Sequence, residues 1–338
     1  MYKQIPIINI DEIINKAFSR SSNIVTRKRR SRNATFKFKE IEKVNMSAKI
    51  INASLYKVLN RFPSLIDGDP FTLHMLDILA DSASVRKDLL AMRRAISSIE
   101  LTRSRIEKRM HKVRDTDEIA ALRSEAYGKY SSILRSLSQN VENINNARQH
   151  IIEIPPITTK DYTVVFAGFP NVGKTSLLSK LTSTKPAIAP YPFTTTGINM
   201  GTFTVKYQRV YAIDTPGLLD RPFSDRNEVE RKAVSAIKYL ANVLVFIFDG
   251  SVSRGYTIEE QYSLLEDTKS RLQDVPIVLV QNKIDMESEE LDVDCRISAK
   301  LGTGVEEFKA YLTDVILKDE AFEEYSELTF ECEEESPY

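Results

Sequence analysis

Residues 168–175 read Gly-Phe-Pro-Asn-Val-Gly-Lys-Thr and match the phosphate-binding loop G-x-x-x-x-G-K-[ST] in full. The apolar run before them, at 163–167, is typical of a buried strand. Gly168 and Gly173 let the backbone approach a polyphosphate and turn its N–H groups toward the phosphate oxygens. A helix beginning near Lys174 would add the positive end of its dipole. The stretch therefore predicts a strand, a phosphate-binding turn and a helix in succession.

The side chains of this loop have distinct expected roles. Lys174 is expected to reach the β- and γ-phosphates and to serve in catalysis, while the Thr175 hydroxyl is expected to ligate Mg²⁺. The other expected nucleotide contacts in the loop are Gly168, Pro170, Asn171, Val172, Gly173 and Ser176. The alternative is an ordinary glycine-containing turn between a strand and a helix, and three later motifs make that alternative negligible.

The first of these motifs is Asp214-Thr-Pro-Gly217, which follows the apolar run 210–213. The Asp214 carboxylate can hold Mg²⁺ through water. The Gly217 N–H can sense the γ-phosphate, and Gly217 is therefore counted with the catalytic residues. Alone, the motif would be typical of a plain turn. Its position after the phosphate loop favours the nucleotide site.

The second motif, Asn282-Lys-Ile-Asp285, follows the apolar run 277–281 and is expected to select the base. Asp285 can accept hydrogen bonds from the N1–H and 2-amino groups of guanine. Adenine has no such donors and would leave the carboxylate unpaired. Asn282 can tie the base to the phosphate loop, and the aliphatic stem of Lys283 can cover the base. The motif predicts guanine specificity.

The third motif is Ser298-Ala-Lys300, which is weak by itself and gains weight from its position. The Ala299 N–H would meet the guanine carbonyl, with Ser298 and Lys300 beside it. Together the four ordered motifs predict a GTP-binding domain.

The stretch Tyr191-Pro-Phe-Thr-Thr-Thr-Gly197 is expected to form a loop that offers a hydroxyl to Mg²⁺ and an N–H to the γ-phosphate. Thr194, Thr195 and Thr196 compete for this role, and Thr195 is favoured as metal ligand and catalytic residue. A plain threonine-rich loop leading to a strand at 202–207 is an equal alternative for any one of them.

Leu218 follows Gly217, where many GTPases have a glutamine that orients the attacking water. A leucine side chain cannot orient water. We therefore expect slow GTP hydrolysis, unless another group places the water.

The stretches 168–175, 191–195 and 214–218 resemble the Obg-related branch of GTPases, and Arg221-Pro-Phe-Ser-Asp-Arg-Asn-Glu-Val-Glu230 is similar to its Nog subfamily. Phe62-Pro-Ser near Pro70-Phe71 and a helical first half agree with this. The resemblance, to a short archaeal member, implies an N-terminal helical bundle before the G domain, GTP or GDP with Mg²⁺ as ligands, and a role in assembling the large ribosomal subunit. It also implies that Asn171 helps bind K⁺; a turn role for Asn171 is an equal alternative.

Composition bounds the remaining possibilities. At 338 residues the chain is long for one core, and no apolar run reaches the ~20 residues of a membrane span. The N-terminus does not resemble a secretory signal. Cys295 and Cys332 have no spacing that suggests a metal site or a disulfide framework. A cytoplasmic protein, monomeric when free, is expected, and a membrane-associated transport GTPase is disfavoured.

The charges divide between the two ends of the chain. Residues 1–160 hold 29 Lys and Arg against 17 Asp and Glu, and the remainder holds 18 against 30. The densest basic run is Arg27-Lys-Arg-Arg30, followed by Arg32, Lys37 and Lys39, with Phe36 and Phe38 between them. The charge split and the resemblance favour contact with ribosomal RNA over a solvated charge run.

Apolar residues at three- and four-residue spacing predict helices over 11–21, 38–60 and 71–80, a long helix from about 84, and a last helix from about 118 to about 149. The predicted domains are a helical bundle (1–157), an α/β P-loop G domain with a mostly parallel six-stranded sheet (158–318) and an acidic tail (319–338), which is expected to be disordered or a loosely docked helix. The competing function is a nucleotide-regulated interaction module with negligible turnover.

Overall fold

The computed structural model describes residues 5–25, 29, 31–65, 68–182, 185–191 and 197–326. The chain folds into two compact units. Met1–Gly68 and Leu79–Ile152 form the first, and Asp69–Ile78 and Glu153–Tyr338 form the second.

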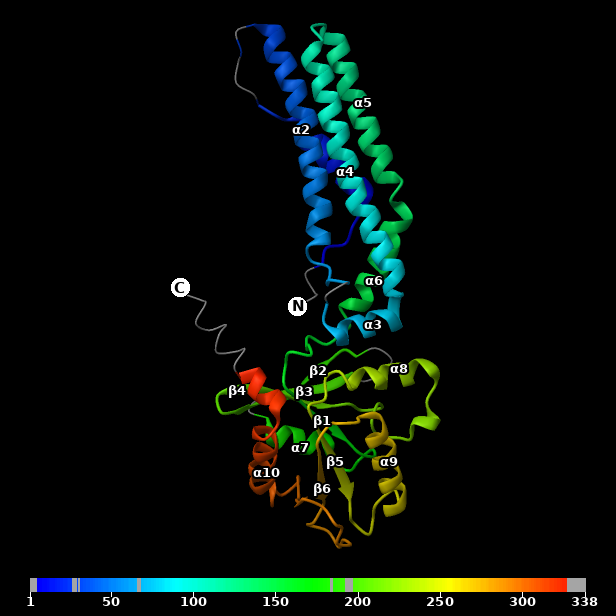
Figure 1. Ribbon diagram of the computed structural model, residues 1–338, viewed down its shortest axis with the longest axis vertical. Helices are drawn as coiled ribbons and strands as arrows, with labels where there is room; N and C mark the ends of the chain where they lie inside the picture. Colours follow the sequence, from blue (N-terminus) through cyan, green and yellow to red (C-terminus); the bar gives the residue numbers. More distant parts are fainter. Residues whose placement is uncertain are drawn as a thin grey trace. The chain divides into compact units, whose positions relative to one another are not determined.

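The first unit is a helical bundle whose long helices run side by side (Figure 1). Its helices are α1 (Ile10–Ser22), α2 (Arg32–Leu59), α4 (Ser82–Lys112), α5 (Thr116–Arg135) and α6 (Ser138–Ile151). Helix α2 packs against α1, α4 and α5, and α4 also packs against α5 and α6. The predicted all-α unit is confirmed.

Two helix boundaries differ from the sequence expectation. Helix α2 begins at Arg32 and not near 38, because the Ser31 side chain accepts from the Ala34 N–H and caps it. The helix expected to run from about 118 to about 149 is two helices, α5 and α6. At their junction Ser136 and Ser138 donate their hydroxyls to backbone carbonyls, which competes with helical hydrogen bonding. Buried Leu134 and Leu137 keep the helical spacing of apolar residues across the junction. The sequence pattern therefore does not indicate that the helix ends there.

The second unit contains a seven-stranded sheet in the order β2-β3-β4-β1-β5-β6-β7. The strands are β1 (Thr163–Ala167), β2 (Ala187–Ala189), β3 (Ile198–Val205), β4 (Gln208–Asp214), β5 (Val243–Asp249), β6 (Ile277–Asn282) and β7 (Cys295–Arg296). Pairings are parallel except β2 with β3 and β3 with β4. Six strands were predicted. The edge strand β2 is too short, and too exposed, to give a period-2 signal.

The strand expected at 202–207 is β3, which ends at Val205. Lys206 and Tyr207 both have positive φ, 43° and 71°, and form the two-residue turn into β4. Two positive φ values in succession match the twist of antiparallel strands. The predicted strand therefore extended two residues too far, into this turn.

The sheet is flanked by helices, as predicted (Figure 1). These are α7 (Lys174–Leu181), α8 (Glu228–Ile237), α9 (Ile258–Arg271) and α10 (Val305–Leu317), with a 3₁₀ turn, η2, at Phe223–Asp225. Strands β1 and β5 are buried along their whole length, as suits a parallel sheet covered on both faces. The parallel strands end at one common edge, where ligands bind in such sheets.

Most of helix α3 (Pro70–Ala80) belongs to the second unit, although it lies in the sequence among the bundle helices. The Tyr191 hydroxyl lies 3.8 Å from Met75 Sδ, and the Phe71 and Tyr191 ring centroids are 6.4 Å apart. Asp69 accepts from the N–H and hydroxyl of Thr159 at 2.7 and 2.8 Å. The domain boundaries at 157 and 318 stay predictions.

The start of the acidic tail packs on the second unit. Residues 320–326 are helical, and Phe322 is 3% exposed, edge-on to the Tyr162 ring. The Tyr162 hydroxyl donates to Asp319 at 2.5 Å. Of the two alternatives for the tail, the docked helix and not disorder describes residues 320–326, while 327–338, with Cys332, lie outside the described residues. No helix in the described ranges is long and apolar enough to cross a membrane.

Candidate nucleotide site

The phosphate loop connects β1 to α7 and needs glycine at two positions. Gly168 has φ 130°, and a Cβ there would lie 2.5 Å from the Ile247 carbonyl oxygen. Gly173 has φ 104°, and a Cβ there would collide with the Asn282 side chain. Asn171 also lies in the left-handed region, with φ 66°. The backbone conformation itself thus requires the loop's glycines.

Lys174 is buried in the mouth of this loop. Its ammonium donates to the carbonyls of Gly168 at 2.7 Å and Phe169 at 2.9 Å. Burial lowers the pKa of Lys174, while the carboxylates of Asp214 and Asp220 oppose that shift. The Lys174 ammonium is therefore held by the carbonyls of its own loop, within the electrostatic influence of the Asp214 and Asp220 carboxylates.

Thr175, at the start of α7, meets Asp214, at the end of β4. The Thr175 hydroxyl donates to Asp214 Oδ2 at 2.5 Å, and the Asn199 side-chain amide donates to the same oxygen at 3.0 Å. Among the described residues, the buried Asp214 Oδ1 and Thr215 Oγ1 have no partner. A buried carboxylate oxygen without a partner is costly. This oxygen-rich set fits Mg²⁺ and its water ligands.

Asn199 was missed by sequence reasoning. It stands directly opposite Asp214 in the antiparallel register of β3 and β4. The only available signal was its place at the start of a strand after the threonine-rich loop. Thr194, Thr195 and Thr196 themselves lie outside the described residues.

Asn282, at the end of β6, joins the base motifs to the phosphate loop. Its side-chain amide donates to the Val172 carbonyl at 2.7 Å, and its side-chain oxygen accepts from the Ala299 N–H at 2.9 Å. The second bond means that the Ala299 N–H expected to meet guanine is engaged with Asn282 here. The three stretches that were expected to share one site are thereby in contact.

Asp285 is exposed and is held by its neighbour. The Ser298 hydroxyl donates to Asp285 Oδ1 at 2.6 Å, and this bond lowers the pKa of Asp285. The carboxylate is therefore ionised near neutral pH and acts only as an acceptor. Pro170, Ser176 and Lys300 are exposed, whereas Ser298 is buried.

Lys283 is oriented by a carboxylate that sequence reasoning also missed. Its ammonium lies 2.6 Å from Asp249 Oδ2, at the end of β5. Asp249 is 5% exposed, and its other oxygen accepts from the N–H and hydroxyl of Ser251. The sequence offered one signal for its role in the site, namely a single Asp at the end of the apolar run that forms β5.

Comparison with known proteins identifies the family. Residues 2–158 match the model of the NOG1 N-terminal helical domain, and residues 163–283 match that of the 50S ribosome-binding GTPase. The uncharacterised protein MJ1408 of Methanocaldococcus jannaschii is 36% identical over 294 residues, covering 86% of this chain and 82% of the relative. The chain belongs to the Nog family of GTPases. The predicted resemblance to that family is confirmed.

Eukaryotic Nog proteins are longer than the matched region. Nucleolar GTP-binding protein 1 of Arabidopsis thaliana is 32% identical over 246 residues, which are 73% of this chain and 37% of the relative. The Saccharomyces cerevisiae protein of that name is 32% identical over 236 residues, 70% and 36% of the two chains. A solved nucleolar GTP-binding protein 1 from Plasmodium falciparum is 28% identical, with a TM-score of 0.43, and covers 54% of this chain and 96% of that one. This chain therefore spans little over a third of the Arabidopsis thaliana and Saccharomyces cerevisiae relatives.

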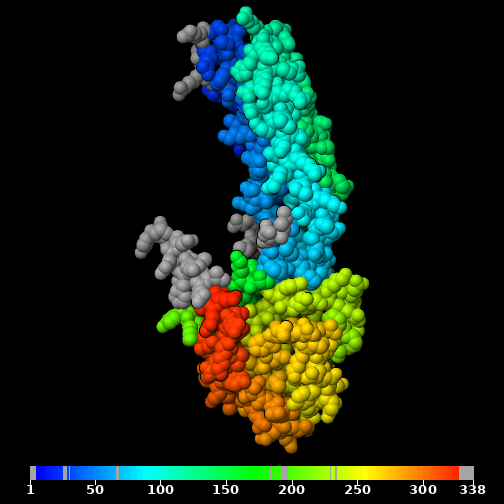
Figure 2. All heavy atoms as spheres, in the orientation of Figure 1, coloured from blue at the N-terminus to red at the C-terminus, as the bar shows by residue number. Residues whose placement is uncertain are grey.

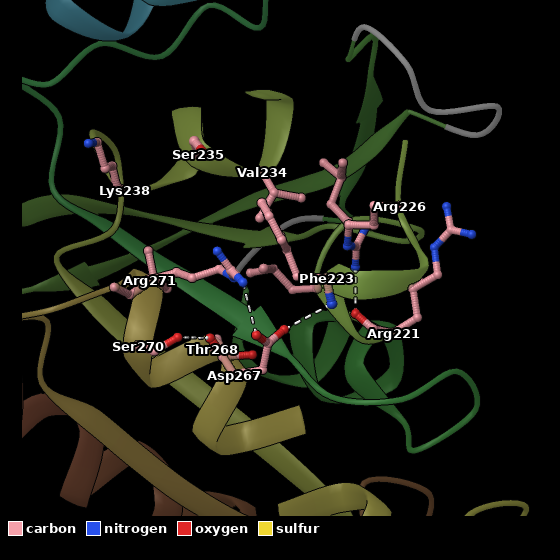
Figure 3. Close-up of a pocket in the computed structure, with 13 residues that line it drawn as sticks. Arg221, Phe223, Arg226, Val234, Ser235, Lys238, Asp267, Thr268, Ser270 and Arg271 are labelled. Carbon is pink, nitrogen blue, oxygen red and sulfur yellow. Dashed lines mark hydrogen bonds and ion pairs between the residues drawn. The ribbon is translucent and has the colours of Figure 1, made fainter. Parts of the chain in front are cut away.

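The GTPase fold of the Nog family implies guanine-nucleotide binding. In this member Gly217 has φ 81°, and its N–H donates to Asp220 Oδ2 at 2.7 Å. The side chain of Leu218 is 1% exposed. It lines a pocket of about 190 Å³ between α8 and α9 (Figure 3). A leucine buried there contributes no polar group to the phosphate site.

Proposed function

We propose that this Nog-type protein binds GTP with Mg²⁺, hydrolyses it slowly, and acts in assembly of the large ribosomal subunit by contacting RNA. One observation carries the nucleotide part. The bonds of Asn282 to Val172 and Ala299 tie the phosphate loop to two base motifs that begin 110 residues after it in the sequence. A cytoplasmic location and a monomeric free state stay predictions.

In the proposed site each residue has one task. Lys174 leaves the carbonyls of Gly168 and Phe169 to bind the β- and γ-phosphates. Thr175 and Asp214 hold the metal, directly and through water, and Asn199 fixes the carboxylate. Bound Mg²⁺ supplies positive charge against the phosphates. Thr195 is proposed as the further metal ligand and catalytic residue.

The base is proposed to lie between the motifs of β6 and β7. Asp285 accepts from guanine while Ser298 steadies its other side, and the Lys283 stem covers the ring. Asp249 holds the ammonium of Lys283 and so sets the direction of that stem. Guanine specificity follows, because adenine would leave the Asp285 carboxylate unpaired.

Hydrolysis is proposed to be slow without a partner. GTPases that have the glutamine but no arginine finger turn over at roughly 10⁻⁴ to 10⁻³ s⁻¹. Leu218 stands where the glutamine would be, and its apolar side chain is buried and cannot orient a water molecule. A ribosomal particle would then accelerate the reaction by placing the water.

RNA contact is proposed for the helical unit, and α4 offers a described surface for it. Seven cations lie on the face of α4 opposite its buried residues, within about 120° of arc at 3.6 residues per turn. They are Arg86, Lys87, Arg93, Arg94, Arg105, Lys108 and Lys112. Within the described ranges none of them forms an ion pair, and no acidic residue shares the face. Figure 2 shows this helix, cyan to blue-green, on the surface along the bundle. Such a face matches a polyanion.

The basic run before α2 is a weaker candidate. Arg27, Lys28 and Arg30 lie outside the described residues. Lys37 forms hydrogen bonds within the bundle: its ammonium donates to the carbonyls of His111 and Val113 at 2.6 and 2.7 Å. The Arg29 guanidinium lies 4.2 Å from the centre of the Phe38 ring. Part of this run therefore has structural roles.

Co-sedimentation with purified ribosomal subunits tests the proposal. The protein should pellet with the large subunit more strongly with a non-hydrolysable GTP analogue than with GDP. Equal pelleting with GDP and with the analogue would refute the proposal that subunit binding depends on the nucleotide. Multiple-turnover phosphate release with and without subunits separates the proposal from the alternative, an interaction module with negligible turnover, which predicts no acceleration.

A further inference from the structure

Both peptide groups of Gly217 are held by side chains of the segment that follows it. The N–H donates to Asp220 Oδ2 at 2.7 Å, and the carbonyl accepts from Arg226 Nη1 at 2.8 Å. The other terminal nitrogen of Arg226 donates to the Arg221 carbonyl at 2.8 Å. Gly217 is thus held on both sides, by an acid three residues and a base nine residues further along the chain.

Both of these side chains are buried. Asp220 is 9% exposed and Arg226 is 4% exposed. Burying a carboxylate and a guanidinium is costly unless their hydrogen bonds are satisfied, so these bonds matter more than surface ones would.

The segment is also fixed to α9. Asp267 accepts from the Phe223 N–H at 2.9 Å and pairs with Arg271 at 3.1 Å. The Arg271 guanidinium lies 3.3 Å from the centre of the Phe223 ring (Figure 3). The backbone that carries Asp220 and Arg226 is therefore held in place independently of any nucleotide.

Asp220 lies near the phosphate-binding residues. The Leu219 carbonyl next to it accepts from the Gly168 N–H of the phosphate loop at 3.0 Å. The carboxylate thus holds the N–H that the γ-phosphate would use, in a segment whose backbone is itself bonded to the phosphate loop.

We propose that Asp220 is a positioning residue that stands in for the γ-phosphate at the Gly217 N–H and thereby makes the protein favour GDP over GTP. This rests on the proposed nucleotide site. A triphosphate must displace the carboxylate from Gly217 and approach its negative charge. A diphosphate ends before that point and meets neither cost. Arg226 holds the Gly217 carbonyl, which keeps the N–H directed at whichever anion is present.

The test compares Asp220→Asn and Asp220→Ala with the wild type in the full-length protein. The control is Glu228→Gln, which removes one negative charge from the exposed first turn of α8. Calorimetry with Mg²⁺ gives the Kd values for GDP and for a non-hydrolysable GTP analogue. Hydrogen exchange of the Gly217 amide in nucleotide-free protein reports the bond directly.

For Asp220→Ala we expect analogue affinity to rise about tenfold relative to GDP, since a hydrogen bond to a charged group is worth about that factor or more. Asp220→Asn should give a smaller rise, and Glu228→Gln none. Gly217 should exchange faster in Asp220→Ala. An unchanged Kd ratio in both variants, or weaker analogue binding, overturns the inference. If Asp220 has a purely structural role, its replacement weakens the binding of GDP and of the analogue by the same factor, and that result also overturns the inference. Wild-type protein that binds neither nucleotide would instead refute the proposed function.

Discussion

The side-chain amide of Asn282 donates to the Val172 carbonyl at 2.7 Å, while its oxygen accepts from the Ala299 N–H at 2.9 Å. A single buried side chain thus bonds to two loops from different strands of the sheet. Gly173 packs against the same side chain and has no room for a Cβ. The base motif and the phosphate loop therefore form one rigid structure, and nucleotide binding should depend on both.

Base selection gives the first prediction. Asp285→Asn removes the paired acceptor for guanine, so GTP affinity should fall by at least about tenfold while binding of xanthosine triphosphate improves. Calorimetry with both nucleotides measures this. Asp292→Asn, an exposed carboxylate seven residues further on, is the control and should change neither. Equal GTP affinity in Asp285→Asn would refute the assigned base pocket.

Potassium dependence separates the two interpretations of Asn171. If its side chain helps bind K⁺, phosphate release should be faster in K⁺ than in Na⁺, and Asn171→Gly should abolish the difference. Glycine keeps the left-handed backbone, φ 66° in this structure, so the turn itself survives. Equal rates in the two salts, or an intact potassium effect in Asn171→Gly, would leave Asn171 as a turn residue only.

The basic run gives a salt-dependence prediction. Replacing Arg27, Lys28, Arg29 and Arg30 by Ala should weaken RNA binding and flatten the slope of log K against log salt by about 3 units if all four contact phosphates. GTP affinity should not change, and thermal stability should fall only by the loss of the Arg29 contact with the Phe38 ring, about 0.5–1 kcal/mol at an exposed site. An unchanged slope with lost stability would show that the run serves the bundle.

The cationic face of α4 gives a parallel prediction. Arg86, Arg93 and Lys108 to Ala should flatten the same slope by about 2 units, since each phosphate contact on single-stranded RNA contributes about 0.7. The matched control replaces Lys232, Lys269 and Lys309, which are three lysines of the second unit that already pair with acids on their own helices. If both triple variants change the slope equally, binding depends on net charge and not on this face.

The packed start of the acidic tail gives a stability prediction. Phe322→Ala should destabilise the second unit by about 3 kcal/mol, because a buried aromatic ring leaves a cavity against Tyr162. The relevant thermal transition is the one that GDP raises, since a ligand stabilises the unit that binds it. Glu324→Ala, exposed on the same turn, should stay within about 0.5 kcal/mol of wild type. A neutral Phe322→Ala would mean that the tail helix is dispensable.

The sequence by itself determined the family, the order of the two units and the nucleotide-binding motifs. Each motif is a short stretch whose residue types follow from local chemistry. The turn at position 168 has φ 130° and requires glycine, and the residue after Lys174 supplies a hydroxyl. Helix existence was equally readable, because the burial of residues such as Met92 and Ile99 follows a local period. These features need only neighbours along the chain.

The tertiary structure alone decided which distant residues meet. Asn199 faces Asp214 through strand register, Asp249 reaches Lys283 across neighbouring parallel strands, and the Gly217 N–H turns to Asp220 because the buried segment folds back. Most of α3, together with Asp69 before it, joins the second unit through contacts with Tyr191 and Thr159, against its place in the sequence. Such contacts depend on strand order, register and burial, which bring together residues whose spacing along the chain carries no period.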